Sequence, residues 1–192
     1  MQSSSSSLSS HNDKHLSRHL QRLSFFRSDI PHIDSIIDKL IAFQVAIPSS
    51  ALGTGGTRFG RFPGPGEPGS LEQKMEDVGL LHALNRSSGA ISLHIPWDIP
   101  SDYAAIKKLA VDLDLKFDAV NSNTFQNQPG QTHSYKFGSL QHVSKATRQQ
   151  AIDHNIEVIR HGVELGSESL TVWLADGSCF PGQLNFRKAF QN

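Results

Sequence analysis

The spacing of apolar residues along the chain changes several times, and these changes predict helices that alternate with short strands. Helical spacing, with apolar positions every three or four residues, begins near His15 and returns between Pro31 and Leu40, where Asp29 is a plausible cap. Short apolar runs then recur along the chain and indicate four buried strands, at residues 43–47, 91–95, 117–121 and 170–174.

Three helical segments separate these strands. The first is predicted to begin at a capping box formed by Ser70 and Gln73 and to bury Leu71, Met75, Val78 and Leu81. The second is predicted to begin at Ser101 and to bury Ile106, Leu109, Ala110 and Leu113. The third is predicted to run from Ser144 to a stop at Gly166 and to bury Ile152, Ile156, Ile159 and Val163.

The alternation of strands and helices predicts an α/β fold with a parallel sheet and right-handed crossovers. An open doubly wound sheet and a barrel of about 250 residues both fit this order. Four strands and a last helix without a stop signal favour the first half of a (β/α)8 barrel. The glycine-rich run at residues 53–60 begins six residues after Ile47 and opens no helix, so it does not match a dinucleotide-binding turn.

The chain divides into a lead and a main body. Residues 1–14 are rich in serine, and we expect a disordered lead there, followed by a helical extension and the half-barrel over residues 15–192. Residues 49–70 form a long loop rich in glycine and proline. Such a long loop is either a functional arm, which could reach a neighbouring subunit, or a disordered lobe.

Composition narrows the possible partners and the location. The 18 basic and 18 acidic residues leave no net charge, so we expect neither nucleic acid nor an anionic membrane surface as a partner. The single cysteine, Cys179, cannot form an internal disulfide, which fits a reducing, cytoplasmic location. No apolar run approaches the ~18 residues of a membrane span, and residues 1–10 lack the apolar core of a signal peptide.

The C-terminal ends of the strands are where barrels place their active sites. In residues 91–95 the apolar side chains share one face, so His94 is predicted to point from the other face into the barrel mouth. Trp173 holds a similar position on the last strand, where its ring could form the wall of a pocket and its N–H could donate a hydrogen bond. A buried, hydrogen-bonded histidine and a core tryptophan are the structural alternatives.

Other candidates carry weaker signals. Asn121, Ser122, Asn123 and Phe125 end the third strand, and amides suit sugar hydroxyls but are equally common in turns. Asp98 and Asp176 are isolated carboxylates, and nothing in the sequence marks Cys179 as reactive. Five other histidines are predicted to be exposed, three of them at helical spacing, namely His11, His15, His19, His154 and His161.

Several runs of residues resemble one family of enzymes. The runs are Ala46-Ile-Pro-Ser, Gly53-Thr-Gly-Gly-Thr-Arg-Phe-Gly-Arg-Phe-Pro-Gly, Ser92-Leu-His-Ile-Pro-Trp-Asp, Phe117-Asp-Ala-Val-Asn-Ser-Asn-Thr-Phe, His133-Ser-Tyr-Lys-Phe-Gly-Ser-Leu and Leu170-Thr-Val-Trp-Leu-Ala-Asp-Gly-Ser-Cys-Phe-Pro-Gly. They are similar to the broad-specificity bacterial L-rhamnose isomerases, which belong to the xylose-isomerase-like barrels. The resemblance implies aldose–ketose interconversion, two divalent metal ions, typically Mn²⁺, and a homotetramer.

The resemblance also assigns roles to individual residues. It implies that His94, Trp173 and Phe125 contact the sugar, and that Phe59 completes the site of a neighbouring subunit. The family has a tryptophan where this chain has Ser50, which removes one wall of the pocket. The family's metal ligands and its lysine near the reacting carbons come from strands five to eight, so we expect this chain to hold no metal and to be inactive alone.

Two other functions stay open at this stage. A non-catalytic half-barrel would expose strand edges and an apolar face, and would act as a self-associating interaction module. Another metal-dependent barrel enzyme, such as a nuclease, would require a basic surface that the neutral composition does not provide.

Overall fold

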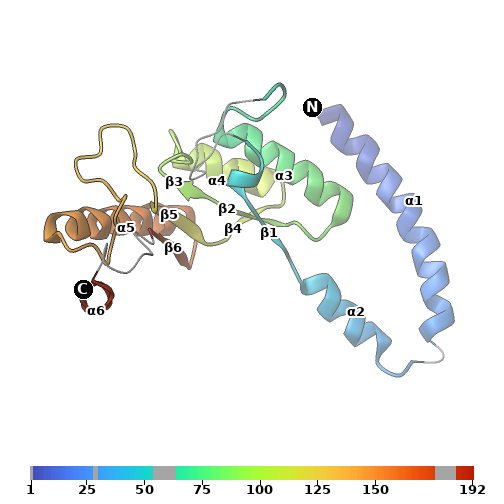
Figure 1. Cartoon of the computed structure of the whole chain (residues 1–192). Coiled ribbons are helices and arrows are strands. Elements are labelled where there is room, and N and C mark those ends of the chain that lie inside the picture. The colour runs from blue at the N-terminus through green and yellow to red at the C-terminus, as the bar shows by residue number, and fades with distance from the viewer. Residues whose placement is uncertain (1, 28–29, 54–63, 176–184) are drawn as a thin grey trace.

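The computed structural model describes residues 2–27, 30–53, 64–175 and 185–192. Within them the chain is an α/β structure whose strands all pair in parallel, as predicted (Figure 1). One sheet has the order β1-β2-β4, with β1 at Ala46–Pro48, β2 at Ala90–Ser92 and β4 at Lys116–Phe117. The other has the order β3-β5-β6, with β3 at His94–Ile95, β5 at Val120–Thr124 and β6 at Leu170–Leu174.

The two sheets are joined along the chain, through Leu93 between β2 and β3 and through Asp118 and Ala119 between β4 and β5. The predicted strand at 91–95 is divided at Leu93 into β2 and β3, and the predicted third strand becomes β4 and β5. The Asn121 N–H bonds to the Leu93 carbonyl at 2.7 Å across this junction. When β2 and β3 are counted as one strand, and β4 and β5 as another, neighbouring strands follow one another in sequence. A doubly wound sheet instead reverses its strand order at a switch point. This order is compatible with one arc of a barrel.

The crossover helices form one layer against the sheets. They are α3 (Leu71–Asn85), α4 (Tyr103–Asp112) and α5 (Lys145–Leu165), and they contact one another in sequence order. The predicted cap of α3 is present, since Ser70 Oγ accepts from the Gln73 N–H at 3.3 Å and Gln73 Oε1 accepts from the Gly69 N–H at 2.7 Å. The predicted cap of α4 is wrong by one residue, because the Asp102 carboxylate accepts from two backbone N–H groups.

The core lies between this helix layer and the strands. Met75, Val78, Ile91 and Leu93 are fully buried in one cluster, together with Ile106 of α4. Leu81 of α3, which was predicted to be inside, is 39% exposed. A second cluster joins Ile95 and the sheet to α5 through Val120 and Val158.

The predicted buried face of α5 is wrong. The apolar stripe of Ile152, Ile156, Ile159 and Val163 is between 41% and 72% exposed. The side that is buried carries mostly small or polar residues, namely Thr147, Ala151, Asn155, Val158, Gly162 and Leu165. Close packing explains this choice, because a Cβ added at Gly162 would lie 2.9 Å from Val120 Cγ2. Small residues therefore let α5 approach β5, and the isoleucines are left on the outer side.

The N-terminal helices extend away from the sheets (Figure 1). The helix α1 spans Gln2–Arg27, so residues 2–14, which were expected to be a disordered lead, are helical. Serine has a moderate helix propensity, and the run contains no proline or glycine that would stop the helix. The next helix, α2, spans Ile33–Ala42 and has no side-chain cap at His32, while Asp29 lies outside the described residues.

Three smaller features complete the fold. A short 3-10 turn, η1, follows β1 at Ser49–Ala51, and residues 54–63 of the predicted arm lie outside the described part. The helix α6 spans Phe186–Gln191. Of the helices in the described part, none is both long enough and apolar enough to cross a membrane.

Candidate functional site

His94 lies where β3 pairs with β5. Its neighbours Ile91, Leu93 and Ile95 are fully buried in the clusters under the helices, so the alternation of the strand directs His94 to the opposite face. In the parallel ladder His94 is in register with Asn121. The imidazole is 6% exposed, so it is almost completely covered by the residues around it.

Aromatic rings from three strand ends gather around this histidine. The His94 and Trp173 ring centroids are 6.4 Å apart, and those of Phe125 and Trp173 are 6.1 Å apart. The structure therefore brings together the three residues that the sequence singled out on three separate strands. It adds Trp97, whose ring centroid lies 6.3 Å from that of His94 and which the sequence analysis did not select.

Asn121 fixes the position of Trp173. Its Oδ1 accepts a hydrogen bond from the Trp173 indole N–H at 3.2 Å, and its Nδ2 donates to the Leu93 carbonyl at 3.0 Å. The indole N–H was expected to serve a ligand, but it is already bonded within the protein. Trp173 therefore offers its ring faces rather than a donor, and half of the residue is exposed. Both polar atoms of the Asn121 side chain are therefore engaged within the fold.

A buried ion pair lies directly beneath His94. The Lys74 ammonium of α3 is 2.7 Å from Asp98 Oδ1, and the two side chains are 5% and 1% exposed. Asp98 Oδ2 accepts from the His94 backbone N–H at 2.7 Å and from the Ser49 hydroxyl. Asp98 thus ties the ends of β1, β3 and α3 together, as buried charges require when they are removed from water.

The position of Lys74 in the sequence is a signal for this ion pair. Lys74 falls three residues after Leu71 and four before Val78, which places it on the inward stripe of α3. A lysine on a buried stripe needs a buried acid, and Asp98 was the isolated carboxylate next to the strand end.

The environment of His94 favours its neutral form. Burial lowers the pKa of His94 below its usual value of 6.5, Asp98 acts in the raising direction, and Lys74 adds to the lowering. His94 Nδ1 is buried and has no hydrogen-bond partner among the described residues. A neutral imidazole with a vacant ring nitrogen can donate to or accept from a hydroxyl group, depending on its tautomer.

The other polar residues of β5 are mostly engaged in the fold. Asn123 Nδ2 donates to the Gln126 carbonyl at 3.2 Å, and the Asn123 N–H donates to His154 Nε2 at 3.2 Å. Ser122 is fully buried, and its hydroxyl has no partner among the described residues. His154 was predicted to be on the surface, but its side chain is only 16% exposed because it closes this backbone bond.

His161 is also less exposed than predicted. Its side chain is 17% exposed, its ring stacks on Tyr103 of α4, and its Nδ1 is hydrogen-bonded to the Tyr103 hydroxyl. Burial raises the pKa of Tyr103, with smaller contributions from Glu164 and Glu157. This pair joins α4 to α5 and stabilises the helix layer.

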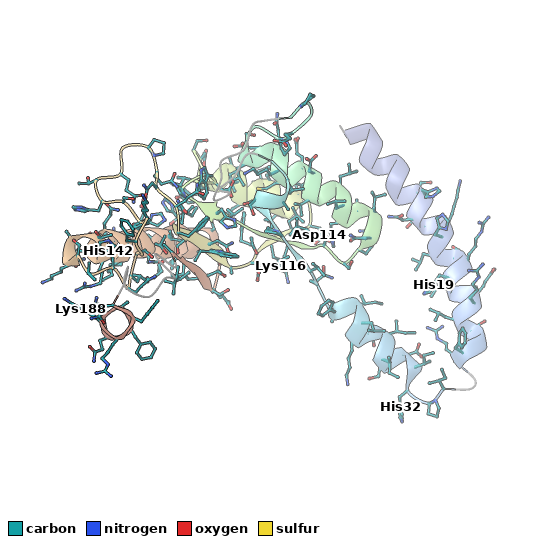
Figure 2. The ribbon with its side chains drawn as sticks, viewed as in Figure 1. His19, His32, Asp114, Lys116, His142 and Lys188 are labelled. Carbon is teal, nitrogen blue, oxygen red and sulfur yellow. The ribbon has the colours of Figure 1, made fainter. Side chains whose placement is uncertain are left out.

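The remaining candidates lie outside the described residues, in the turn after β1, or on the N-terminal helix. Phe59, Asp176 and Cys179 lie outside the described residues, and Ser50 lies in η1. His11, His15 and His19 are exposed on α1, as predicted, with His11 and His15 Nε2 atoms 3.0 Å apart. Figure 2 shows His19 on α1 and His32 in the turn before α2, both apart from the sheets. Within the described ranges, no three His, Cys, Asp or Glu side chains are grouped to hold a metal ion.

Comparisons with known proteins point to one class of enzyme. The chain is similar to a probable sugar isomerase of Rhizobium meliloti (strain 1021), with 57% identity over 159 residues that make up 83% of this chain. It is also similar to a probable sugar isomerase of Mesorhizobium japonicum, with 52% identity over 159 residues. The chain spans 37% of the length of each relative. No protein-family model matches it.

Proposed function

We propose that this chain forms the sugar-contacting wall of a metal-dependent aldose–ketose isomerase of the L-rhamnose to L-rhamnulose type. The observation that supports the proposal best is the cluster of His94, Trp173 and Phe125 at the ends of adjacent parallel strands. The similarity to two probable sugar isomerases agrees with it. In a parallel α/β fold the strand ends are where ligands bind.

Each residue of the cluster has a distinct part in this proposal. Neutral His94 would hydrogen-bond a sugar hydroxyl or carbonyl oxygen through a ring nitrogen. The ring faces of Trp173 and Phe125 would pack against the C–H groups and the methyl group of a 6-deoxyaldose. Asn121 would position Trp173 and not touch the sugar. Phe59 would complete the site of a neighbouring subunit in a homo-oligomer.

A divalent cation such as Mn²⁺ would polarise the sugar carbonyl in the complete enzyme. The described residues of this chain do not fit a metal, because no suitable group of ligands is assembled among them. Following the resemblance to L-rhamnose isomerases, we assign the metal ligands to the part of the complete enzyme that corresponds to strands five to eight. The chain alone would bind the sugar weakly and would not isomerise it.

Tryptophan fluorescence tests sugar binding in this chain directly. The sequence has two tryptophans, so Trp97→Phe leaves Trp173 as the only emitter. Titrating this variant with L-rhamnose should give a saturable change in emission, because the sugar displaces water from the indole ring. Adding His94→Ala should weaken the apparent affinity about tenfold or more, the usual effect of losing one buried hydrogen bond to a ligand.

The controls separate the strand ends from the rest of the surface. His19→Ala removes an exposed histidine on α1 and should leave the titration unchanged. Manganese-dependent formation of L-rhamnulose by the unmodified chain would contradict the assignment of the metal ligands. Emission that does not respond to L-rhamnose, to other aldoses or to ketoses would contradict the sugar site itself.

The exposed stripe on α5 favours a second candidate function, a non-catalytic module that self-associates. Ile152, Ile156, Ile159 and Val163 form an apolar ridge, and Val172 and Leu174 of the neighbouring strand are also exposed. Analytical ultracentrifugation distinguishes the candidates. Concentration-dependent oligomers without sugar binding would favour the module, and sugar binding by a monomer would favour the enzyme fragment.

A further inference from the structure

A groove on the N-terminal helix α1 is lined by three arginines and two histidines among its nine residues. It lies between α1 and the C-terminal end of α3 and has a volume of about 610 Å³. Its lining residues are Asn12, Asp13, His15, Leu16, Arg18, His19, Arg22, Leu84 and Arg86. A hydrogen bond from Asn12 Nδ2 to the Ala83 carbonyl joins the two helices at one end of the groove.

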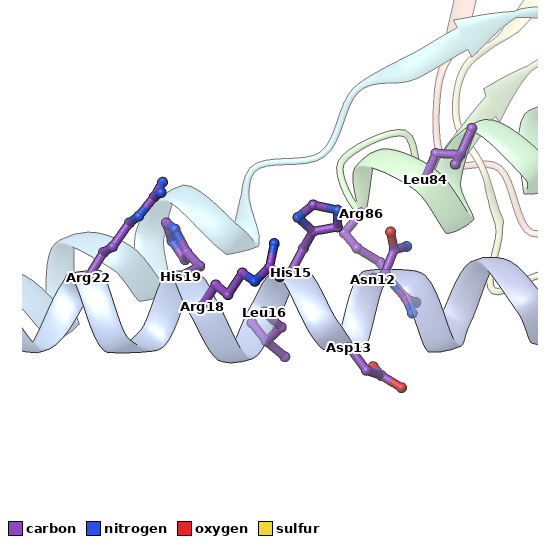
Figure 3. A pocket seen from close by; sticks show the side chains of 9 residues that line it. All are labelled: Asn12, Asp13, His15, Leu16, Arg18, His19, Arg22, Leu84 and Arg86. Carbon is purple, nitrogen blue, oxygen red and sulfur yellow. The ribbon is translucent and has the colours of Figure 1, made fainter.

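The basic residues of α1 lie on one side of the helix. His15, Arg18, His19 and Arg22 are spaced at i, i+3, i+4 and i+7, which places them in a continuous stripe. Figure 3 shows His15, His19 and Arg22 projecting from one side of α1. The lining also contains one acidic residue, Asp13, so with three arginines the groove is net positive on a chain whose net charge is zero.

This charge is not balanced by the fold. In the part of the chain that the structure describes, Arg18, Arg22 and Arg86 form no ion pair. Other basic residues do find acids, among them Lys74 with Asp98, Lys107 with Glu164 and Arg27 with Asp34. The neutral chain has as many carboxylates as lysines and arginines, but Asp13 is the one acidic residue among those that line the groove.

The stripe of basic residues also lowers the stability of α1. Two like charges four residues apart destabilise a helix, and Arg18 and Arg22 have this spacing. Arg86 has a separate reason for its position, since a cation is favoured at the C-terminal end of α3. The stripe lies in the interior of α1, where the helix dipole gives no such compensation. A bound anion would offset the repulsion between the Arg18 and Arg22 side chains, and anion binding would explain why the stripe is present.

We propose that this groove binds a small phosphate-bearing metabolite, such as a phosphorylated sugar, through the guanidinium groups of Arg18, Arg22 and Arg86. One guanidinium group can donate two parallel hydrogen bonds to phosphate oxygens, and three such groups supply enough positive charge to balance a dianion. The volume exceeds that of a phosphate ion and falls in the range for small metabolites. Leu84 and Arg86 precede the N-terminal end of β2, whereas His94 follows the C-terminal end of that strand. The groove is therefore separate from the His94 cluster. The inference does not depend on the proposed isomerase function.

Nuclear magnetic resonance of the full chain tests the site. The probe is glucose 6-phosphate, followed through the arginine Nε–Hε signals at low ionic strength. Saturable shifts should appear on the groove arginines, and inorganic phosphate should shift the same signals. Glucose should shift none. The double substitution Arg18→Gln and Arg22→Gln should weaken binding about tenfold or more, as expected when two charge-assisted contacts are lost.

Two matched variants control for net charge. Lys14→Gln changes one charge on the same helix outside the groove, and Arg160→Gln makes the same exchange on exposed α5. Each should change the affinity less than about twofold. Equal weakening by these controls and by the groove variants would overturn the proposal, as would unshifted arginine signals with both phosphates. Glutamine favours helices, and circular dichroism verifies that each variant retains α1.

Discussion

A lysine is buried on the first crossover helix of this protein, whereas three isoleucines are exposed on the third. On α3 the inward stripe runs from Leu71 through Lys74 to Val78, and the lysine is stabilised there by Asp98. On α5 the isoleucine stripe faces outward, and Ala151, Val158 and Gly162 face the sheet. Residue polarity alone therefore predicts the wrong face on α5, and on α3 it misses the buried lysine within an otherwise correct face.

The difference between the two helices follows from what surrounds them. The helix α3 contacts the sheet, α4 and the N-terminal helix α1. The helix α5 contacts β5, β6 and α4, and its isoleucines lie on the side left uncovered by the described elements. How closely a helix must approach the sheet and which neighbours it has determine which of its residues are buried.

The largest expected effect comes from breaking the buried pair on α3. Lys74→Met should lower the free energy of unfolding by about 3–5 kcal/mol, because it leaves the Asp98 carboxylate buried without its cation. Urea denaturation followed by circular dichroism measures this change. The double variant Lys74→Met and Asp98→Asn should recover part of the loss, since no uncompensated charge then stays in the interior.

An exposed pair provides the control for this prediction. Lys108 and Asp112 are bonded one turn apart on α4, and both side chains are more than half exposed. Lys108→Met should change the free energy of unfolding by about 0.5 kcal/mol or less. A similar loss for Lys74→Met and Lys108→Met would show that the Lys74–Asp98 pair is not sequestered from water.

A medium effect should distinguish the two faces of α5. Val158→Ala removes two methyl groups from a fully buried position and should cost about 2 kcal/mol. Ile156→Ala removes more apolar surface from the outer stripe, yet it should cost about 0.5 kcal/mol or less because that residue is 43% exposed. Denaturant midpoints of the two variants at one protein concentration give the comparison. The reverse order of stability would place the isoleucine stripe inside.

Much of the fold could be predicted from local patterns. The strand at 170–174 and the cap at Ser70 lie where the sequence predicted them, because alternation and capping depend on neighbouring residues. The gathering of His94, Phe125 and Trp173 could also be anticipated, since the C-terminal ends of parallel strands meet at one edge of a sheet. Their part in sugar binding stays a prediction.

The features that were missed depend on contacts between distant residues. Lys74 and Asp98 are separated by 24 positions, and no local pattern pairs them. Asn121 bonds to Trp173 across 52 positions, so its role as a support could not be distinguished from that of a ligand. The inward face of α5 depends on the close approach of Gly162 to Val120, which requires the packed structure.

The smallest expected effect concerns the proton on His94, on the side of the molecule where the lysine is buried. Burial lowers the pKa of His94 in the folded chain, so the unfolded chain binds this proton more readily. His94 therefore contributes stability above its unfolded pKa of about 6.5, and this contribution is lost as the pH falls through the folded pKa. His94→Gln should remove that part of the pH dependence.

Two measurements check this prediction. The imidazole Cε1–H resonance of His94 should titrate below the usual histidine pKa of 6.5. The difference in unfolding free energy between the unmodified chain and His94→Gln should be constant above about pH 7.5. As the pH falls toward about 5, the unmodified chain should lose stability relative to His94→Gln. A His94 pKa above the usual value of 6.5 would mean that Asp98, and not burial, dominates its environment. The proposal that His94 is neutral when it bonds to a sugar would then be wrong near neutral pH.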